Sequence, residues 1–119
     1  TALAKHVTET ITLSEPAVGI KVLLDANRGN NSFIDVYYKT LAEGSDELID
    51  EQNWVYIPEE TNNPTDEDRK VFREYEYLAG GATGTLDPFT AYKIKIVMRS
   101  GNSSHAPLIS ALRAITLGT

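Results

Sequence analysis

The sequence predicts an all-β protein, an antiparallel β-sandwich of jelly-roll-like type with about seven to eight strands and an acidic loop excursion. Two observations predict this class. Apolar side chains recur at every second position and not with helical spacing, and clusters of Gly, Asn, Ser and Pro separate the alternating runs. Cysteine is absent, so a packed core has to stabilise the fold without disulfides. We expect the 119 residues to form one such domain, spanning 1–119.

Seven runs have strand character. They are 5–13, 18–26, 33–41, 53–57, 70–78, 90–100 and 108–117. In most of them one face is apolar and the other polar, as in strands with one buried face. The sixth run shows this most clearly, because Tyr92, Ile94, Ile96 and Met98 alternate with Lys93, Lys95 and Arg99. The apolar set is expected to face the core and the basic set to face solvent.

The last run, LISALRAITL at 108–117, is apolar on both faces except at Arg113. This pattern is typical of a strand that is covered on both sides. The polar loop at 100–107 would join it to the sixth run as a hairpin. We therefore expect the terminal strand to lie between neighbours or under a partner. The residues expected to be buried are Leu108, Leu112 and Ile115.

Polar turns separate the strands at 28–32, 80–88 and 100–107. Residues 43–69 are predicted to leave the sandwich as an excursion that the 53–57 strand anchors midway. Its first part contains Leu48 and Ile49, around which a single helical turn can form. Its second part, from residue 59, has the low hydrophobicity and high charge of a mobile loop.

The net charge of −6 is unevenly distributed. Residues 43–76 contain twelve of the seventeen acidic residues and three basic ones, so this segment carries −9 and the rest of the chain +3. An acidic middle disfavours nucleic acid as a partner, because phosphate binding requires clustered Lys and Arg. No apolar run approaches the roughly 20 residues of a membrane helix, so no membrane insertion is expected.

No catalytic constellation emerges from the sequence, and we expect a protein that is not an enzyme and has no cofactor. His6 and His105 are the only histidines, and the Ser103–Ser104 pair beside His105 is not part of a GxSxG turn. Paired carboxylates from the acidic middle would lack the rigid support that catalysis requires. The GGATGT segment at 80–85 lacks the lysine of a phosphate-binding loop.

A calcium site is the metal centre considered. The candidate ligands are Asp25, Asn27, Asn30 and Asn31, which cluster around a turn. Oxygen ligands suit a hard cation, but the spacing matches no EF-hand. The turn preference of Asn and Asp explains the cluster equally well, so no metal is expected.

Aromatic residues are numerous for a small sandwich. They include Trp54, Tyr56, Phe72, Tyr37, Tyr38, Tyr75, Tyr77 and Tyr92. We expect most of them to pack in the core or at sheet edges, but exposed rings can stack on sugars or anchor a protein interface. The binding residues proposed from the sequence are Trp54, Tyr56, Lys93, Lys95 and Arg99.

Several motifs together resemble a module of tailed-bacteriophage virion structural proteins. They are KVLLDANRGNNSFIDVYYKTL (21–41), the Trp-containing strand, REYEY (73–77), LDPFTAYKIKIVMRSGN (86–102) and PLISALRAITL (107–117). The resemblance covers about residues 5–117. In those tail, baseplate or particle-surface proteins the module often lies at the C-terminal end of a longer chain, which fits the start at Thr1.

The resemblance implies a β-sandwich located in the virion, with no known reaction. Its expected partners are other virion proteins, with homo-oligomers in the particle. The basic face of the 90–99 strand would meet the acidic excursion of a neighbour. The alternative is a carbohydrate-binding module of a host-recognition fibre or spike, in which Trp54, Tyr56 and the 28–32 turn would contact a host surface glycan.

Overall fold

The computed structural model describes residues 2–29, 32–58, 68, 70–80, 85–100 and 107–118, and it shows an antiparallel all-β protein. The elements are β1 (Ala2–Val7), β2 (Ile11–Asn27), β3 (Ser32–Ala42), the 3₁₀ helix η1 (Ile49–Glu51), β4 (Val55–Ile57), β5 (Arg73–Gly80), β6 (Phe89–Ser100) and β7 (Leu108–Gly118). The fold class predicted from the alternation is confirmed. The strand pairings do not by themselves establish a jelly-roll connectivity.

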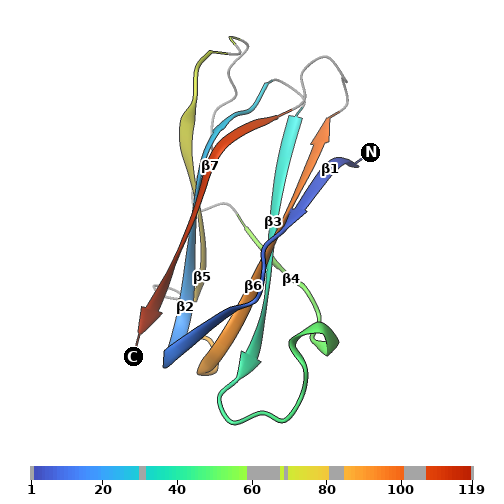
Figure 1. Cartoon of the computed structure of the whole chain (residues 1–119). Helices are drawn as coiled ribbons and strands as arrows, with labels where there is room; N and C mark the ends of the chain where they lie inside the picture. Colours follow the sequence, from blue (N-terminus) through green and yellow to red (C-terminus); the bar gives the residue numbers. More distant parts are fainter. Residues whose placement is uncertain are drawn as a thin grey trace.

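The strands form two layers that share one strand (Figure 1). The first layer has the order β4-β3-β6, and the free side of β6 is paired with β1 and with the beginning of β2. The second layer has the order β5-β2-β7. We call them the β3–β6 layer and the β2–β7 layer. The long strand β2 belongs to both, because residues 11–17 pair with β6 and residues 17–27 pair with β5 and β7.

The change of layer within β2 occurs at a proline. The ladder between β2 and β6 shifts register between Thr12 and Ala17, and Pro16 lies inside this interval. Strands that pass from one sheet to another do so through such irregularities. Proline suits the position, because it has no N–H to donate to a ladder.

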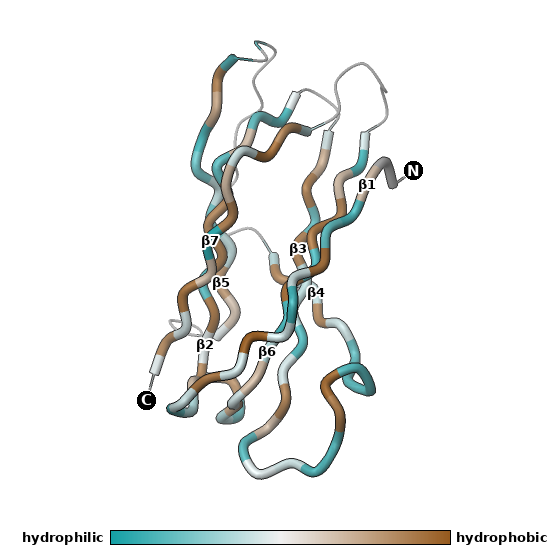
Figure 2. Tube along the Cα trace, viewed as in Figure 1, coloured by the Kyte–Doolittle hydropathy of each residue, from teal (hydrophilic) through white to brown (hydrophobic). Residues whose placement is uncertain are grey.

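The core lies between the layers and follows the predicted alternation. Its largest fully buried side chains include Tyr75, Tyr77, Phe89, Ile20, Leu24, Ile94 and Ile96. The Tyr77 hydroxyl donates a hydrogen bond to the Ile34 carbonyl oxygen at 3.4 Å, which links β5 in one layer to β3 in the other. Figure 2 shows that the loop between β3 and β4 is mostly hydrophilic, in contrast to the strands.

The predicted run 5–13 is divided in the structure. β1 ends at Val7 and β2 begins at Ile11, although both lie along the same side of β6. At the break, the Thr8 N–H donates to the Ile94 carbonyl and the Ile94 N–H donates to the Thr8 hydroxyl. A side-chain oxygen therefore replaces a backbone acceptor, which interrupts the ladder at this point.

The predicted burial of the terminal strand is wrong. Within the described residues, β7 pairs with β2 alone and forms an edge of its layer. Leu108 and Ile115 are each 40% exposed, and Leu112 is partly buried against the core. The predicted hairpin is also wrong, because β6 and β7 lie in different layers. An apolar run reports the character of both faces of a strand but not whether another strand lies beside it.

The excursion after β3 agrees with its predicted form where the structure describes it. The expected helical turn is η1, which begins directly after Leu48 and contains Ile49. The Leu48 N–H donates to the Glu51 carboxylate at 3.0 Å, which supports the start of this turn. The mobile loop expected from residue 59 lies largely outside the described residues.

Candidate binding face

The candidate site is the outward face of the β3–β6 layer, which we call the aromatic–basic face. It consists of Phe33, Tyr37 and Lys39 on β3, Lys93, Lys95 and Arg99 on β6, Tyr56 on β4, and Trp54 just before β4. All five binding residues proposed from the sequence belong to it. The sequence suggested an aromatic group and a basic group, and the fold places them together.

Strand register explains how the two groups meet. Tyr37 lies opposite Lys95 on one side and opposite Tyr56 on the other, and Phe33 lies opposite Arg99. Side chains that are directly opposite in an antiparallel pair point to the same face of the sheet. The alternation that directs Ile34, Val36, Ile94 and Ile96 into the core therefore directs these rings and cations outward.

The cations lie against the rings. Lys95 Nζ is 4.6 Å from the centroid of the Tyr37 ring and 4.9 Å from that of Trp54. Lys39 Nζ is 4.7 Å from the Trp54 centroid. The Tyr37 and Tyr56 rings form an edge-to-face pair with centroids 5.6 Å apart. Each cation–π contact of this kind contributes about 0.5–2 kcal/mol, and together they restrict the orientations of the rings.

Lys39 is only 6% exposed, because the excursion folds back over it. Trp54 covers its ammonium group, and the Asp50 carboxylate lies 3.9 Å from it. The same carboxylate lies 3.4 Å from Lys93 Nζ. The acidic partner expected from a neighbouring molecule is thus supplied in part by the same chain. Because the Asp50 side chain is 78% exposed, these ion pairs stabilise the fold only weakly.

At the other end of the face, Arg99 is held by Asp35. The guanidinium donates two hydrogen bonds to the carboxylate, and its Cζ lies 4.9 Å from the centroid of the Phe33 ring. The hydrogen bond to Asp35 and the charge of that carboxylate raise the pKa of Arg99 above its ordinary value. The group therefore remains charged at any physiological pH.

What the face offers to solvent is mainly ring surface. Tyr56 is 50% exposed and Phe33 is 42% exposed. The cations next to them already have partners within the chain. Among the described residues of the face there is no paired nucleophile and base, so the arrangement suits stacking and apolar contact.

Sequence reasoning missed several members of the face, for two reasons. Phe33 and Tyr37 alternate with Ile34 and Val36, so the period alone was sufficient to place them outward. The same period places Lys39 outward, but its burial under Trp54 and its contact with Asp50 depend on how the excursion returns to the sheet. Most of the aromatics were expected to pack in the core or at sheet edges. Tyr75, Tyr77 and Tyr92 are buried in the core and Tyr38 packs partly buried against it, whereas the other four named aromatics are partly or largely exposed.

The calcium candidates are not brought together as a described site. Asp25 is exposed on β2, and its carboxylate accepts a hydrogen bond from Ser110 at 2.7 Å. Asn27 is buried, and its amide donates to the carbonyl oxygens of Asp68 and Val71 at 2.9 and 2.8 Å. This side chain holds the chain segment that enters β5. Asn30 and Asn31 lie outside the described residues.

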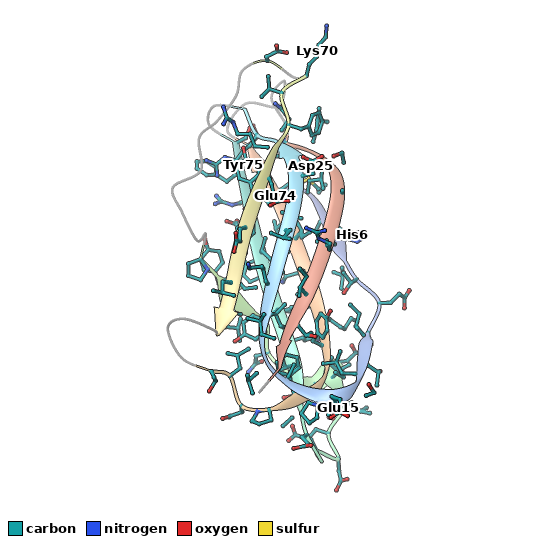
Figure 3. All side chains as sticks on the ribbon, turned by 90° about the vertical axis from the view of Figure 1, so that its left-hand side faces the viewer. His6, Glu15, Asp25, Lys70, Glu74 and Tyr75 are labelled. Atoms are coloured by element: carbon teal, nitrogen blue, oxygen red, sulfur yellow. The ribbon has the colours of Figure 1, made fainter. Side chains whose placement is uncertain are left out.

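The described part of the chain contains no group of three or more His, Asp or Glu side chains arranged to hold a metal ion. Of the histidines, His6 is exposed on β1 (Figure 3), where it lines a groove of about 260 Å³ next to β6 and β7. His105 and the adjacent serines lie outside the described residues. The part of the molecule that the structure describes has no helix with the length and hydropathy of a membrane span.

Comparison with protein-family models, with curated proteins and with solved structures found no match to this chain. No relative therefore assigns a role to the aromatic–basic face. Its interpretation depends on the chemistry of the residues themselves and on the motifs described above.

Proposed function

We propose that the protein is a non-enzymatic binding module that docks a protein partner through the aromatic–basic face. The single observation that carries this proposal is the set of exposed rings, Phe33 and Tyr56 above all, which contacts within the chain hold in place. Arg99, itself paired with Asp35, lies against the Phe33 ring, and Tyr37 forms an edge-to-face pair with Tyr56. Pre-ordered aromatic side chains lose little conformational entropy on binding. Tyr, Trp and Arg are also the residues that contribute most at protein interfaces.

The charges of the face favour protein over nucleic acid. Lys93 pairs with Asp50, Arg99 pairs with Asp35, and Lys95 lies against two rings. A phosphate backbone would have to displace these contacts on a chain whose net charge is −6. A protein partner that covers the rings and leaves the ion pairs at the rim of the interface does not have to break these contacts.

The resemblance to tailed-bacteriophage modules supports a specific setting for this docking. In our proposal the protein is a structural part of the virion, in the tail, the baseplate or the particle surface. Its partner on this face is then another virion protein. The support for the virion setting is the series of sequence motifs, and the support for the docking face is its geometry.

The test is a pair of substitutions in a phage that carries the protein. Phe33→Ala with Tyr56→Ala removes the exposed ring surface, and we expect at least a tenfold loss of assembled, infectious particles by electron microscopy and plaque titre. Phe72→Ala with Val71→Ala is the matched control, because these apolar side chains are also exposed but lie away from the face. Circular dichroism of the purified variants shows whether they fold. Normal assembly of the folded double variant would contradict the proposal.

A second candidate is glycan binding, which the exposed Tyr56 ring favours; this ring forms an edge-to-face pair with the partly buried Tyr37. Trp54 is a less suitable platform for a sugar than the sequence suggested. It is only partly exposed, and two ammonium groups already lie within 5 Å of its ring centroid. A glycan array separates the two functions. Binding that Tyr56→Ala abolishes would support this candidate, and an array without signal would eliminate it for the glycans displayed.

A further inference from the structure

The free edge of β7 is the second unusual surface of the molecule. β7 is eleven residues long, and within the described chain its side facing away from β2 has no strand partner. Its sequence contains one charged residue, Arg113, and no Pro or Lys. Natural edge strands are normally protected by such residues, because an open apolar edge invites pairing with another chain.

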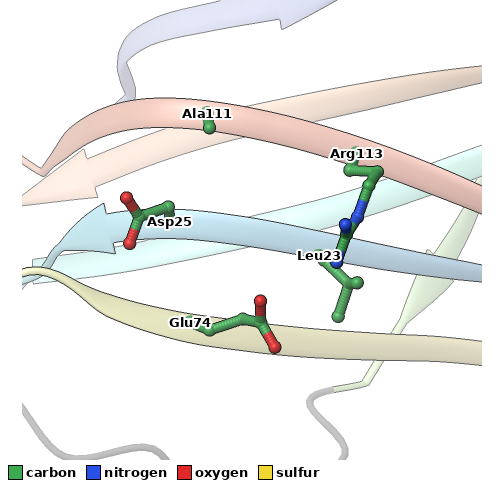
Figure 4. Close-up of a pocket in the computed structure, with 5 residues that line it drawn as sticks. All are labelled: Leu23, Asp25, Glu74, Ala111 and Arg113. Atoms are coloured by element: carbon green, nitrogen blue, oxygen red, sulfur yellow. The ribbon is translucent and has the colours of Figure 1, made fainter.

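A hollow of about 330 Å³ lies beside this edge, on the outward face of the β2–β7 layer (Figure 4). It is lined by Leu23, Asp25, Glu74, Ala111 and Arg113. Asp25 lies directly opposite Glu74 on one side and opposite Ala111 on the other (Figure 4). Two carboxylates thus face each other across β2 and β5, an arrangement that is unfavourable without a cation. The small Ala111 side chain leaves open space toward the β7 edge.

Two basic side chains of the same layer, Lys21 and Arg113, could neutralise Asp25 and Glu74, but neither is paired with them within the chain. Lys21 is paired with Glu76 at 3.1 Å, one step further along the sheet. Arg113 lies opposite Leu23, and it has neither a hydrogen bond nor an ion pair within the part of the chain that the structure describes. An exposed guanidinium without a partner and an exposed carboxylate pair therefore lie on the same sheet face.

We propose that β7 pairs antiparallel with β7 of a second copy, across a two-fold axis that passes through Leu112. In this register Arg113 of one copy lies opposite Ala111 of the other. Neighbouring strands are about 4.8 Å apart. The long guanidinium side chain therefore extends over Ala111 into the hollow and meets Asp25 and Glu74. The two-fold symmetry produces this contact twice. Charge complementarity therefore favours a second copy of the chain as the partner whose side chain fills the hollow.

Other registers of the β7–β7 pairing do not bring Arg113 of one copy next to Asp25 and Glu74 of the other. An axis through Arg113 would place the two guanidinium groups opposite each other. An axis through Ala114 would place Arg113 opposite Ile115, whose neighbour on β2 is Lys21. Like charges in adjacent cross-strand positions destabilise a sheet. Only the axis through Leu112 combines the free edge with opposite charges.

Charge exchange tests the contact. An interface of one strand pair is small, so we expect the unmodified chain to dimerise at a concentration on the order of 100 µM. Analytical ultracentrifugation there should give a mass above the 13.1 kDa of the monomer. Arg113→Glu and Asp25→Lys should each weaken association at least tenfold, and the double variant should return to within threefold of the original. Lys5→Glu is the control, because it makes the same charge change as Arg113→Glu on the other layer.

The register is tested by single cysteines, since the chain has none of its own. Leu112→Cys should form a disulfide-linked dimer under mild oxidation, and Ala114→Cys should not. Circular dichroism confirms that each variant is folded. A strictly monomeric chain at this concentration, tight association of Arg113→Glu, failure of the double variant to recover, or cross-linking at position 114 instead of 112 would each overturn the proposal. This inference concerns a different surface and does not depend on the aromatic–basic face.

Discussion

The outward faces of the two layers carry similar charged residues, but they differ in how far these charges are paired within the chain. On the β3–β6 layer, each of Lys39, Lys93, Lys95 and Arg99 lies against a ring or a carboxylate of the same chain. On the β2–β7 layer, Asp25 lies opposite Glu74, while Arg113 has no partner among the described residues. The difference arises because the excursion folds back over the first face and supplies Trp54 and Asp50. Lys39 and Lys93 are also like charges directly opposite each other, but the excursion supplies Asp50 to both. Where no other segment of the chain supplies such a partner, the charges remain available to another molecule.

The largest expected effect separates the shared strand from the edge strand. Leu24 on β2 is fully buried, and Leu24→Ala should lower the free energy of unfolding by about 3–4 kcal/mol through lost burial and a residual cavity. Ile115 on β7 is 40% exposed, so Ile115→Ala should cost about 1 kcal/mol or less at concentrations where the chain is monomeric. Urea denaturation measures both. Equal losses would mean that β7 is as deeply packed as β2.

Two glycines compare the packing on the two sides of β2, because one ends β5 and the other ends β7. Gly80, at the end of β5, has a φ of 79°, and a Cβ there would lie 2.7 Å from the Val18 carbonyl oxygen of β2. We expect Gly80→Ala to cost about 1–3 kcal/mol, because the backbone is strained and the carbonyl cannot move easily. At the end of β7, Gly118 has open space around its Cα, and Gly118→Ala should be nearly neutral. Thermal unfolding of the two variants tests the difference, and a stable Gly80→Ala protein would contradict it.

A smaller effect tests whether the first face is self-sufficient. Trp54→Ala should lower the free energy of unfolding by about 1–2 kcal/mol, because it uncovers Lys39 and removes two cation–π contacts. Asp50→Ala should change it by about 0.5 kcal/mol or less, since that carboxylate is mostly exposed. Urea denaturation at low and high salt measures both. If Asp50→Ala proved the more damaging change, ion pairs and not the ring would hold the excursion.

The smallest expected effect concerns alkaline pH. Burial raises the pKa of Tyr92, and also that of Tyr38, above the ordinary value of 10.0. A raised pKa in the folded state means that the folded protein holds the proton more tightly than the unfolded chain. The resulting stability is fully present below pH 10 and is lost as the pH rises through the folded-state pKa. Tyr92→Phe should flatten this alkaline loss in urea titrations between about pH 9 and 11, and an unchanged slope would contradict the assignment.

Much of the fold could be predicted from alternation and turn residues. Each described strand overlaps a predicted periodic run, and β6 directs its apolar and basic residues as expected. The run 5–13, however, is divided between β1 and the beginning of β2, which continues through the run 18–26. The failures share a cause: Leu108 and Ile115 were expected to be buried, and the β6–β7 connection was expected to be a hairpin. Period-2 alternation describes the two faces of one strand, whereas burial and pairing depend on which other strands lie beside it.

The candidate site shows the same limit. Trp54, Tyr56, Lys93, Lys95 and Arg99 were identified as separate groups of rings and cations, and only strand register brought them to one face. Lys39 and Asp50 were not identified, because their contacts join residues through a folded-back loop.

The sequence by itself therefore determined the class of fold, the approximate position of most strands and which side chains point inward along most of them. Those properties depend on local geometry, since successive side chains in an extended chain alternate whatever lies nearby. The tertiary structure decided which strands are neighbours, that β2 belongs to both layers, that β7 is left at an edge, and which charges are paired. These outcomes depend on contacts between residues far apart in the chain, and local spacing carries no information about them.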